Sequence, residues 1–294
     1  MSFDTPLFLC GPLREPKQML ADQEYSGHTS IHDDNMAEKL GFQAGPIEGP
    51  THFSQFTPLL ADIWGQAWFE RGCFSAHFQN MVVEGEQVRA FVERPTPGVN
   101  KVRAWAEKAD GTVVLEASAS LGPDDGESLL DQRMAKLRPP QQLIILSDLH
   151  VGMTGKEDEP VSMGADQNMG NLYPFSLKQK LERITENSAW FSDAASTPWG
   201  RAIIPLEMVS VLAEYSSDLA AFPVKQPVIG LFAGEDYLIR REVVALSESK
   251  RTESYWIRTR IYDAKGATLK AEMLLNHATL KHSYADYEAE AASR

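Results

Sequence analysis

The sequence predicts an α+β fold that is built twice: in each half of the chain, a long apolar helix is followed by strands that wrap it as an antiparallel sheet. Two observations predict this fold. A helical stretch and then several β-rich stretches occur in the same order in both halves. Between the halves lie polar segments that contain proline and glycine and show almost no apolar periodicity. One helix followed by an antiparallel meander, twice over, is typical of a sheet that wraps a helix.

The chain is long enough for two medium-sized domains. It has 294 residues, of which 43% are hydrophobic, so it can bury a sizeable core. We divide it into an N-terminal domain (1–122), a linker (123–176) and a C-terminal domain (177–294). Within the linker, the apolar run QLIILSDL at 142–149 predicts one strand.

In the first half, a short helix is expected over 33–41, followed by the turn FQAGPIEGP and a long helix over 51–70. Phe53, Phe56 and Leu60 fall near helical spacing, which predicts that this helix is buried on most sides. Three β-rich runs follow, at 74–94, 100–110 and 111–122, separated by turn signals such as GVN and ADG.

The second half repeats this order. A helical segment at 180–194 leads through the turn STPWGRAIIP into a long apolar helix over 206–222. Strand-like runs rich in β-branched and aromatic residues then occupy 226–249, 252–266 and 267–283. We interpret the charged and aromatic stretches around Asp193 and at 248–260 as architecture.

Charge and cysteine content exclude several classes of function. The formal charge is −13, and no run of Lys and Arg is longer than two residues, so we expect no nucleic-acid partner. Cys10 and Cys73 are too few for a disulfide framework and indicate reduced thiols in a cytoplasmic protein. A signal segment and an apolar run of roughly 20 residues are both missing, so we expect no membrane association.

Several motifs resemble the MaoC-like hydratase/dehydratase family. They are H-D-D-x-x-A-x-x-L-G-F, then G-P-I-x-G-P, a helix, and F-x-x-x-V-x-x-G-E-x-V at 78–88; WGRAIIPLEM at 199–208 resembles the same turn in the second half. The resemblance covers about two thirds of the chain and implies a tandem double hotdog. It also implies addition of water to an enoyl thioester, or its removal from a 3-hydroxyacyl thioester, carried on coenzyme A or an acyl carrier.

This chemistry needs an acid/base pair and hydrogen-bond donors for the thioester oxygen. His32 is our leading acid/base candidate, assisted by His28 or Glu48. The resemblance places the donors at the start of the long helix, where the backbone N–H groups of Gly49 and Thr51 would bind the thioester oxygen. We expect His52 to line the substrate site.

The sequence departs from the family at its acid/base signature of Asp, any residue, Asn, Pro, an apolar residue and His. An alignment without gaps puts Ser26, His28 and Ile31 at the Asp, Asn and His positions. A gap of one residue places His32 on the histidine but leaves no aspartate. The corresponding positions of the second half carry an arginine, a threonine and a serine, so we expect that half to act as scaffold and as the other wall of the cavity.

Structural roles compete with these assignments. His28 could be a turn residue, His32 and Asp33 a helix-capping pair, Glu48 a helix cap, and His52 a packed helix residue. We expect no metal and no cofactor, because carboxylates do not accompany the histidines at ligand spacing except for Glu48 and His52. A serine hydrolase is disfavoured because the G-x-S-x-G motif is absent.

Two alternatives to a thioester hydratase stay open. One is a lyase, isomerase or cyclase that acts on a non-thioester hydrophobic small molecule in the same pocket. The other is a non-catalytic hotdog that binds an acyl ligand. In each case we expect a homodimer. Cations that could bind the phosphates of coenzyme A are Arg103, Arg240, Arg241, Lys250 and Arg251.

Overall fold

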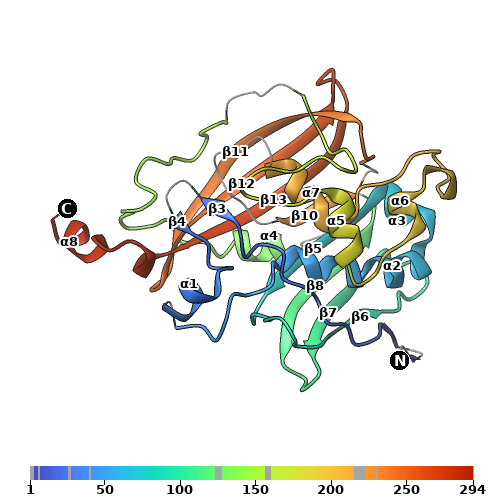
Figure 1. Ribbon diagram of the computed structural model, residues 1–294, viewed down its shortest axis with the longest axis horizontal. Helices are drawn as coiled ribbons and strands as arrows, with labels where there is room; N and C mark the ends of the chain where they lie inside the picture. Colours follow the sequence, from blue (N-terminus) through green and yellow to red (C-terminus); the bar gives the residue numbers. More distant parts are fainter. Residues whose placement is uncertain are drawn as a thin grey trace.

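The computed structural model describes residues 3–5, 7–25, 28–39, 41–122, 128–155, 160–214, 223–228 and 231–293. Eleven strands form one sheet in the order β1-β2-β6-β7-β8-β5-β10-β13-β12-β11-β9, in which neighbouring strands are antiparallel. The sheet crosses the molecule from the first-half strands to the second-half strands, and helices lie against it (Figure 1). This architecture confirms the predicted α+β fold.

The first half supplies the strands from β1 to β5 in the sheet order. Its strands are β1 (Phe3–Asp4), β2 (Phe8–Cys10), β5 (Gly72–Phe78), β6 (Val88–Glu93), β7 (Lys101–Lys108) and β8 (Val113–Leu121). A separate small hairpin consists of β3 (Glu24–Tyr25) and β4 (His28–Thr29). The predicted run 74–94 divides into β5 and β6, and the turn between them includes Gly85 with a positive φ of 91°, a conformation that favours glycine.

The second half continues the same sheet. It contributes β9 (Val161–Ser162), β10 (Pro223–Val228), β11 (Asp236–Glu248), β12 (Thr252–Asp263) and β13 (Leu269–Leu280). β10 pairs with β5 of the first half, with Pro227 opposite Cys73. The two halves are therefore joined edge to edge.

The helices include α1 (Asp34–Lys39), η1 (Gly49–Gln55), α2 (Thr57–Trp64), α3 (Gln66–Arg71), α4 (Leu129–Met134) and α5 (Leu177–Arg183). They continue with α6 (Ala189–Ser192), η2 (Ala194–Ser196), α7 (Leu206–Glu214), η3 (Lys281–Ser283) and α8 (Tyr287–Ser293). η1 of the first half and α7 of the second half contact each other. We call this contact the seam. Buried apolar side chains from both halves form one core around it.

The long helix predicted over 51–70 is broken into η1, α2 and α3. Phe53, Phe56 and Leu60 are buried as expected. Pro58, in the first turn of α2, has no N–H to donate, so the hydrogen bonding of η1 does not continue into α2 as one helix. Gly65 then ends α2 with φ 57° and ψ −140°. In the second half, α7 covers the start of the helix predicted over 206–222, and residues 215–222 lie outside the described part.

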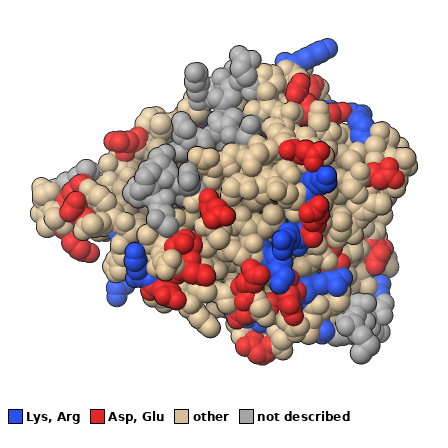
Figure 2. Space-filling view, viewed as in Figure 1, with Lys and Arg blue, Asp and Glu red and all other residues tan. Residues whose placement is uncertain are grey.

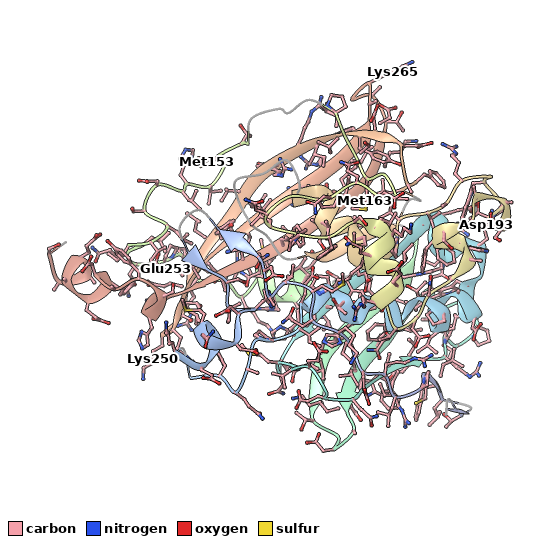
Figure 3. The ribbon with its side chains drawn as sticks, in the orientation of Figure 1. Met153, Met163, Asp193, Lys250, Glu253 and Lys265 are labelled. Atoms are coloured by element: carbon pink, nitrogen blue, oxygen red, sulfur yellow. The ribbon has the colours of Figure 1, made fainter. Side chains whose placement is uncertain are left out.

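The strand predicted at 142–149 is wrong. The backbone N–H groups of Ile144 and Leu146 donate to the carboxylate of Glu253, at 2.8 and 3.0 Å, instead of to a neighbouring strand. The hydroxyl of Tyr287 also donates to Glu253, at 2.9 Å. This buried carboxylate therefore holds the linker and the C-terminal segment on the second-half sheet (Figure 3).

Polar features complete the outline of the fold. On the face drawn in Figure 2, acidic and basic side chains are interspersed. Among the described helices, none is both long enough and apolar enough to cross a membrane.

Asp193 accepts hydrogen bonds from Ala195 N at 2.9 Å and Ser196 Oγ at 2.7 Å. These bonds support the interpretation of this stretch as architecture.

Candidate functional site

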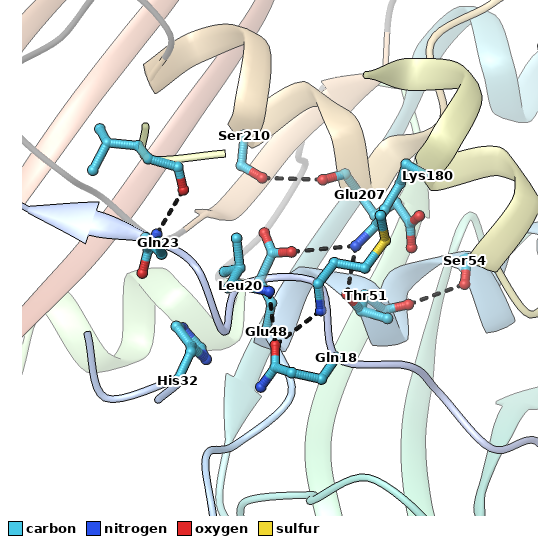
Figure 4. A network of polar contacts seen from close by, with 12 residues as sticks. Gln18, Leu20, Gln23, His32, Glu48, Thr51, Ser54, Lys180, Glu207 and Ser210 are labelled. Carbon is cyan, nitrogen blue, oxygen red and sulfur yellow. Dashed lines mark hydrogen bonds and ion pairs between the residues drawn. The ribbon is translucent and has the colours of Figure 1, made fainter. Parts of the chain in front are cut away.

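A cluster of buried polar residues lies at the seam. Glu48 directly precedes η1, and Glu207 is the second residue of α7. Lys180 comes from α5, in the second half. The relative exposures of Glu48, Lys180 and Glu207 are 4%, 2% and 1%, so three ionisable groups share the protein interior (Figure 4).

Lys180 connects the two halves. Its Nζ atom donates to Oγ1 of Thr51 at 2.9 Å and lies 3.3 Å from Oε2 of Glu48. It also lies over the ring of Phe175, 5.3 Å from the centroid. A buried ammonium group requires such partners, because its desolvation is costly.

Local sequence explains these positions. Residues three apart lie on one side of a 3₁₀-helix, so Glu48, Thr51 and Ser54 form one ridge along η1. Ser176 and Gln179 form a capping box at the start of α5, and this box fixes the turn that carries Lys180.

Burial and the neighbouring charges favour a proton on one carboxyl group of the cluster at neutral pH. Burial raises the pKa of Glu207 from 4.5 to about 8, although Lys180 opposes the shift, and the charge of Glu48 adds to it. Burial alone would lower the pKa of Lys180, but Glu48 and Glu207 together hold it above its ordinary value. At neutral pH we therefore assign a charged Lys180 and a protonated Glu207.

Several polar atoms of the cluster have unused hydrogen-bonding capacity. Among the described residues, Oε1 of Glu48 and both carboxylate oxygens of Glu207 have no hydrogen-bond partner. Ser54 lies close to Glu207, but its hydroxyl donates to the carbonyl of Thr51 at 3.0 Å. Both amide atoms of Gln55, on the same helix, are also without a partner. Buried polar groups usually have partners, so this concentration marks the seam as a candidate site for a polar ligand.

His32 lies beside this cluster. Its ring is buried, and Nδ1 is 2.6 Å from the carbonyl oxygen of Pro46. A carbonyl only accepts, so Nδ1 carries the hydrogen and Nε2 carries the lone pair. Burial lowers the pKa of His32 and outweighs the carbonyl and the nearby charge of Glu48, both of which raise it; Lys180 lowers it further. The imidazole is therefore a neutral base at neutral pH.

A short chain of hydrogen bonds orients His32. Its backbone N–H donates to Oγ of Ser30 at 3.1 Å, and Ser30 donates to Gln23 at 2.6 Å. Gln23 in turn donates to the carbonyl of Leu172 at 2.8 Å, so the linker supports the loop that carries the histidine. Gly45 is required opposite this loop, because a Cβ there would lie 2.2 Å from the carbonyl oxygen of His32.

The charge of Glu48 acts on His32, but among the described residues the recognised partners of these side chains are Pro46 for His32 and Lys180 for Glu48, so their shared acid/base role stays a prediction. Asp33, not His32, caps α1 by accepting from Met36 N at 2.9 Å. His28 lies in β4, but its side chain is outside the described part of the structure, as is Ser26. The acid/base role of His28 stays a prediction.

The predicted substrate-binding residues have different surroundings. Thr51 N–H donates to the carbonyl of Glu48 at 3.1 Å, so it is engaged and not free to hold a thioester oxygen. Gly49 packs against the ring of Phe78. Burial lowers the pKa of His52 to about 4, with smaller contributions from Lys180 and Lys108, which keeps its ring neutral.

The expected role of the second half, as scaffold and as the other wall of the cavity, stays a prediction, but this half contributes charged side chains to the cluster. It supplies Lys180 and Glu207, which sequence reasoning missed. Glu207 could have been noticed as the one acidic residue in the apolar stretch LEMVSVL. Lys180 offered no such signal, because its partners lie 129 and 132 positions away.

Other candidate features lie outside the cluster. One surface hollow is lined by Phe69, Trp190 and neighbouring polar residues, and another by Arg94, Lys101 and Arg103. The remaining cations proposed for phosphate binding lie on β11 or in the turn that follows it. In the part of the chain that the structure describes, no group of three His, Cys, Asp or Glu side chains is placed to hold a metal ion.

Comparisons with known proteins support the fold. No family profile and no curated protein matches the sequence significantly. A protein of Chloroflexus aurantiacus J-10-fl, described as a MaoC-domain dehydratase, superposes with a TM-score of 0.60 at 14% identity, over 95% of this chain and 96% of that one. Rv0216 of Mycobacterium tuberculosis, a double hotdog, gives 0.53 at 12% identity, over 92% and 96%. The predicted double-hotdog fold is thus confirmed.

Proposed function

We propose that this protein is a lyase that adds water to an enoyl thioester or removes it from a 3-hydroxyacyl thioester. The observation that carries the proposal is the combination of a neutral His32 with the ionisable cluster of Glu48, Lys180 and Glu207. Water addition needs one group that exchanges a proton with carbon and another that exchanges a proton with oxygen. The likeness of fold to a protein described as a dehydratase adds support.

In the direction of dehydration, Nε2 of His32 would take the proton from the carbon next to the thioester carbonyl. The N–H of Gly49, at the start of η1, is our candidate donor to the thioester oxygen as that oxygen gains negative charge. Thr51 is no longer a candidate for this role, because its N–H is already bonded. Glu48, held by Lys180, would assist by orienting the substrate's hydroxyl group.

The finer assignments also belong to this proposal. We propose a small-molecule substrate carried on coenzyme A or an acyl carrier, and a cytoplasmic homodimer. The domain boundaries, 1–122 and 177–294 with a linker at 123–176, stay predictions. Light scattering during size-exclusion chromatography tests the dimer directly.

The activity is tested by incubating the protein with crotonyl-CoA and with longer enoyl-CoAs and measuring the 3-hydroxyacyl product. We expect hydration, and we expect His32→Ala to reduce kcat by about 10²–10⁴-fold. His277→Ala is the matched control, because His277 also has its pKa lowered to about 4 by burial, but it is half-buried and lies on β13.

Two results would redirect the proposal. Tight acyl-CoA binding without turnover would indicate a non-catalytic acyl-binding protein. Turnover of a non-thioester substrate alone would indicate a lyase, isomerase or cyclase. Hydration that His32→Ala leaves unchanged would contradict the role of His32.

A further inference from the structure

Glu207 is an unusual residue for its position. It lies in the first turn of α7, among apolar residues, and is 1% exposed. An unpartnered carboxylate in the protein interior is strongly destabilising when ionised. The neighbouring positions of α7 hold leucine, methionine and valine, so Glu207 is the polar exception in this turn.

The charges around Glu207 decide which group holds the proton. Lys180 supplies one positive charge, and its ammonium group donates hydrogen bonds to Glu48 and Thr51. One positive charge balances one carboxylate, and Glu48 is the one that it binds. The second carboxyl group is most stable when neutral. The seam thus contains an acid next to an ion pair, which separates the roles of two similar side chains.

We propose that Glu207 is a catalytic residue that donates a proton to the substrate's oxygen, and that Lys180 is a positioning residue that keeps this proton on Glu207 instead of Glu48. The inference rests on the proposed hydratase function and deepens it. It assigns proton transfer to the substrate's oxygen to the second half of the chain. Proton removal from carbon belongs to His32 of the first half.

The proton balance is complete. In dehydration, His32 Nε2 removes the proton from carbon, and that C–H electron pair forms the new C=C bond. The C–O bond breaks, and its electron pair stays on oxygen, which receives the proton of Glu207 and leaves as water. The products are the enoyl thioester, an imidazolium and a carboxylate; transfer of the proton from imidazolium to Glu207 restores the site.

This scheme predicts the pH profile of kcat/KM. In dehydration, Glu207 is protonated and His32 is neutral; in hydration, Glu207 is ionised and His32 is protonated. In each active form, Glu207 and His32 together carry one proton. Dehydration and hydration therefore have the same pH dependence of kcat/KM. Activity should fall above about pH 8, where Glu207 loses its proton without His32 gaining one.

The test compares the wild type with Glu207→Gln and, as a control, Glu253→Gln. Glu253 is another buried carboxyl group, but it holds the linker and the C-terminal segment. Crotonyl-CoA hydration is measured from pH 5.5 to 9.5. In parallel, infrared difference spectroscopy records the carbonyl band of a protonated carboxyl group in substrate-free protein.

We expect Glu207→Gln to lower kcat by about 10²–10³-fold, to remove the alkaline limb and to abolish the carbonyl band; Glu253→Gln should keep the limb. Unchanged kcat and pH profile in Glu207→Gln would overturn the inference while leaving the hydratase proposal intact. Absence of the carbonyl band in an active wild type would also overturn it. An inactive wild type that shows the band would refute the hydratase proposal itself, and the catalytic role of Glu207 with it.

Discussion

The Nζ atom of Lys180 lies 3.3 Å from Oε2 of Glu48, although the two residues are separated by 132 positions and belong to different halves of the chain. Each half of this duplicated fold therefore supplies one partner of a buried ion pair. The adjacent Glu207 adds a second carboxyl group from the second half. The candidate site is complete only when the two halves pack together.

Loss of Lys180 should destabilise the fold strongly. Lys180→Met keeps most of the apolar stem but leaves Glu48 buried without its positive partner. We expect the free energy of unfolding to fall by about 3–5 kcal/mol, as is typical when one member of a buried pair is removed. Urea denaturation followed by circular dichroism measures the change.

Lys178→Met is the matched control on the same helix. Lys178 is exposed and lies 3.4 Å from the exposed Asp166. Surface pairs of this kind contribute little, so we expect no measurable change. Equal destabilisation by the two substitutions would contradict the role assigned to Lys180.

Glu207 should make stability depend on pH in a defined direction. The folded protein holds its proton up to about pH 8, whereas the unfolded chain releases it near 4.5. Between these values the folded state binds more protons, so this contribution is fully present below pH 4.5 and is lost as the pH rises to 8. The shift corresponds to on the order of 5 kcal/mol.

Other buried groups titrate in the opposite sense, so the measurement must be a difference. His52, with its pKa lowered to about 4, makes the folded state more stable as the pH rises from 4 to 6.5. The unfolding free energy of the wild type minus that of Glu207→Gln removes this contribution. We expect this difference to decrease steadily from pH 5 to pH 8; a flat difference would rule out a protonated Glu207.

The start of η1 should tolerate no side chain at position 49. A Cβ on Gly49 would lie 2.8 Å from Cζ of Phe78, inside normal contact distance. We expect Gly49→Ala to cost about 1–3 kcal/mol, as measured by urea denaturation. Phe78→Leu should recover part of this loss when combined with it.

Gly11→Ala is the control for Gly49→Ala. A Cβ on Gly11 would meet the carbonyl oxygen of Ala90 at 3.6 Å, which is an ordinary contact. Its stability should change much less. Equal losses in both variants would show that loss of glycine itself, and not the contact with Phe78, is responsible.

Glu253 should control the attachment of the linker. Glu253→Gln removes the carboxylate that accepts from Ile144, Leu146 and Tyr287. We expect a loss of about 2–4 kcal/mol and faster proteolytic cleavage within 138–153, because buried N–H groups lose a charged acceptor. In Glu248→Gln, which alters a more exposed contact to Gln141 N, cleavage should change less.

Periodic patterns in the sequence were sufficient to predict the repeated fold. Alternating strands and apolar helices are local signals, so β7, β8, β12 and β13 appear where they were expected. The run at 142–149 failed because its N–H groups are bonded by Glu253, a side chain more than 100 positions away. No local pattern contains such a contact.

For the candidate site, too, the sequence predicted only the residues that lie within one short segment. His32 and Glu48 lie in one short segment with recognisable turns, and they were identified from it. Lys180 and Glu207 reach the site only through the packing of α5 and α7 against η1, which spacing along the chain does not reveal. The break of the first long helix followed from Pro58 and Gly65, whose signals the apolar periodicity of 51–70 had outweighed.

The most direct test of the proposed acid/base chemistry is incubation of the wild-type protein with crotonyl-CoA in D₂O, followed by mass spectrometry of the product. We predict 3-hydroxybutyryl-CoA with one deuterium on the carbon next to the thioester carbonyl, and loss of this product in His32→Ala. Recovery of unchanged crotonyl-CoA between pH 6 and pH 9, or release of free coenzyme A without a hydrated product, would contradict the account.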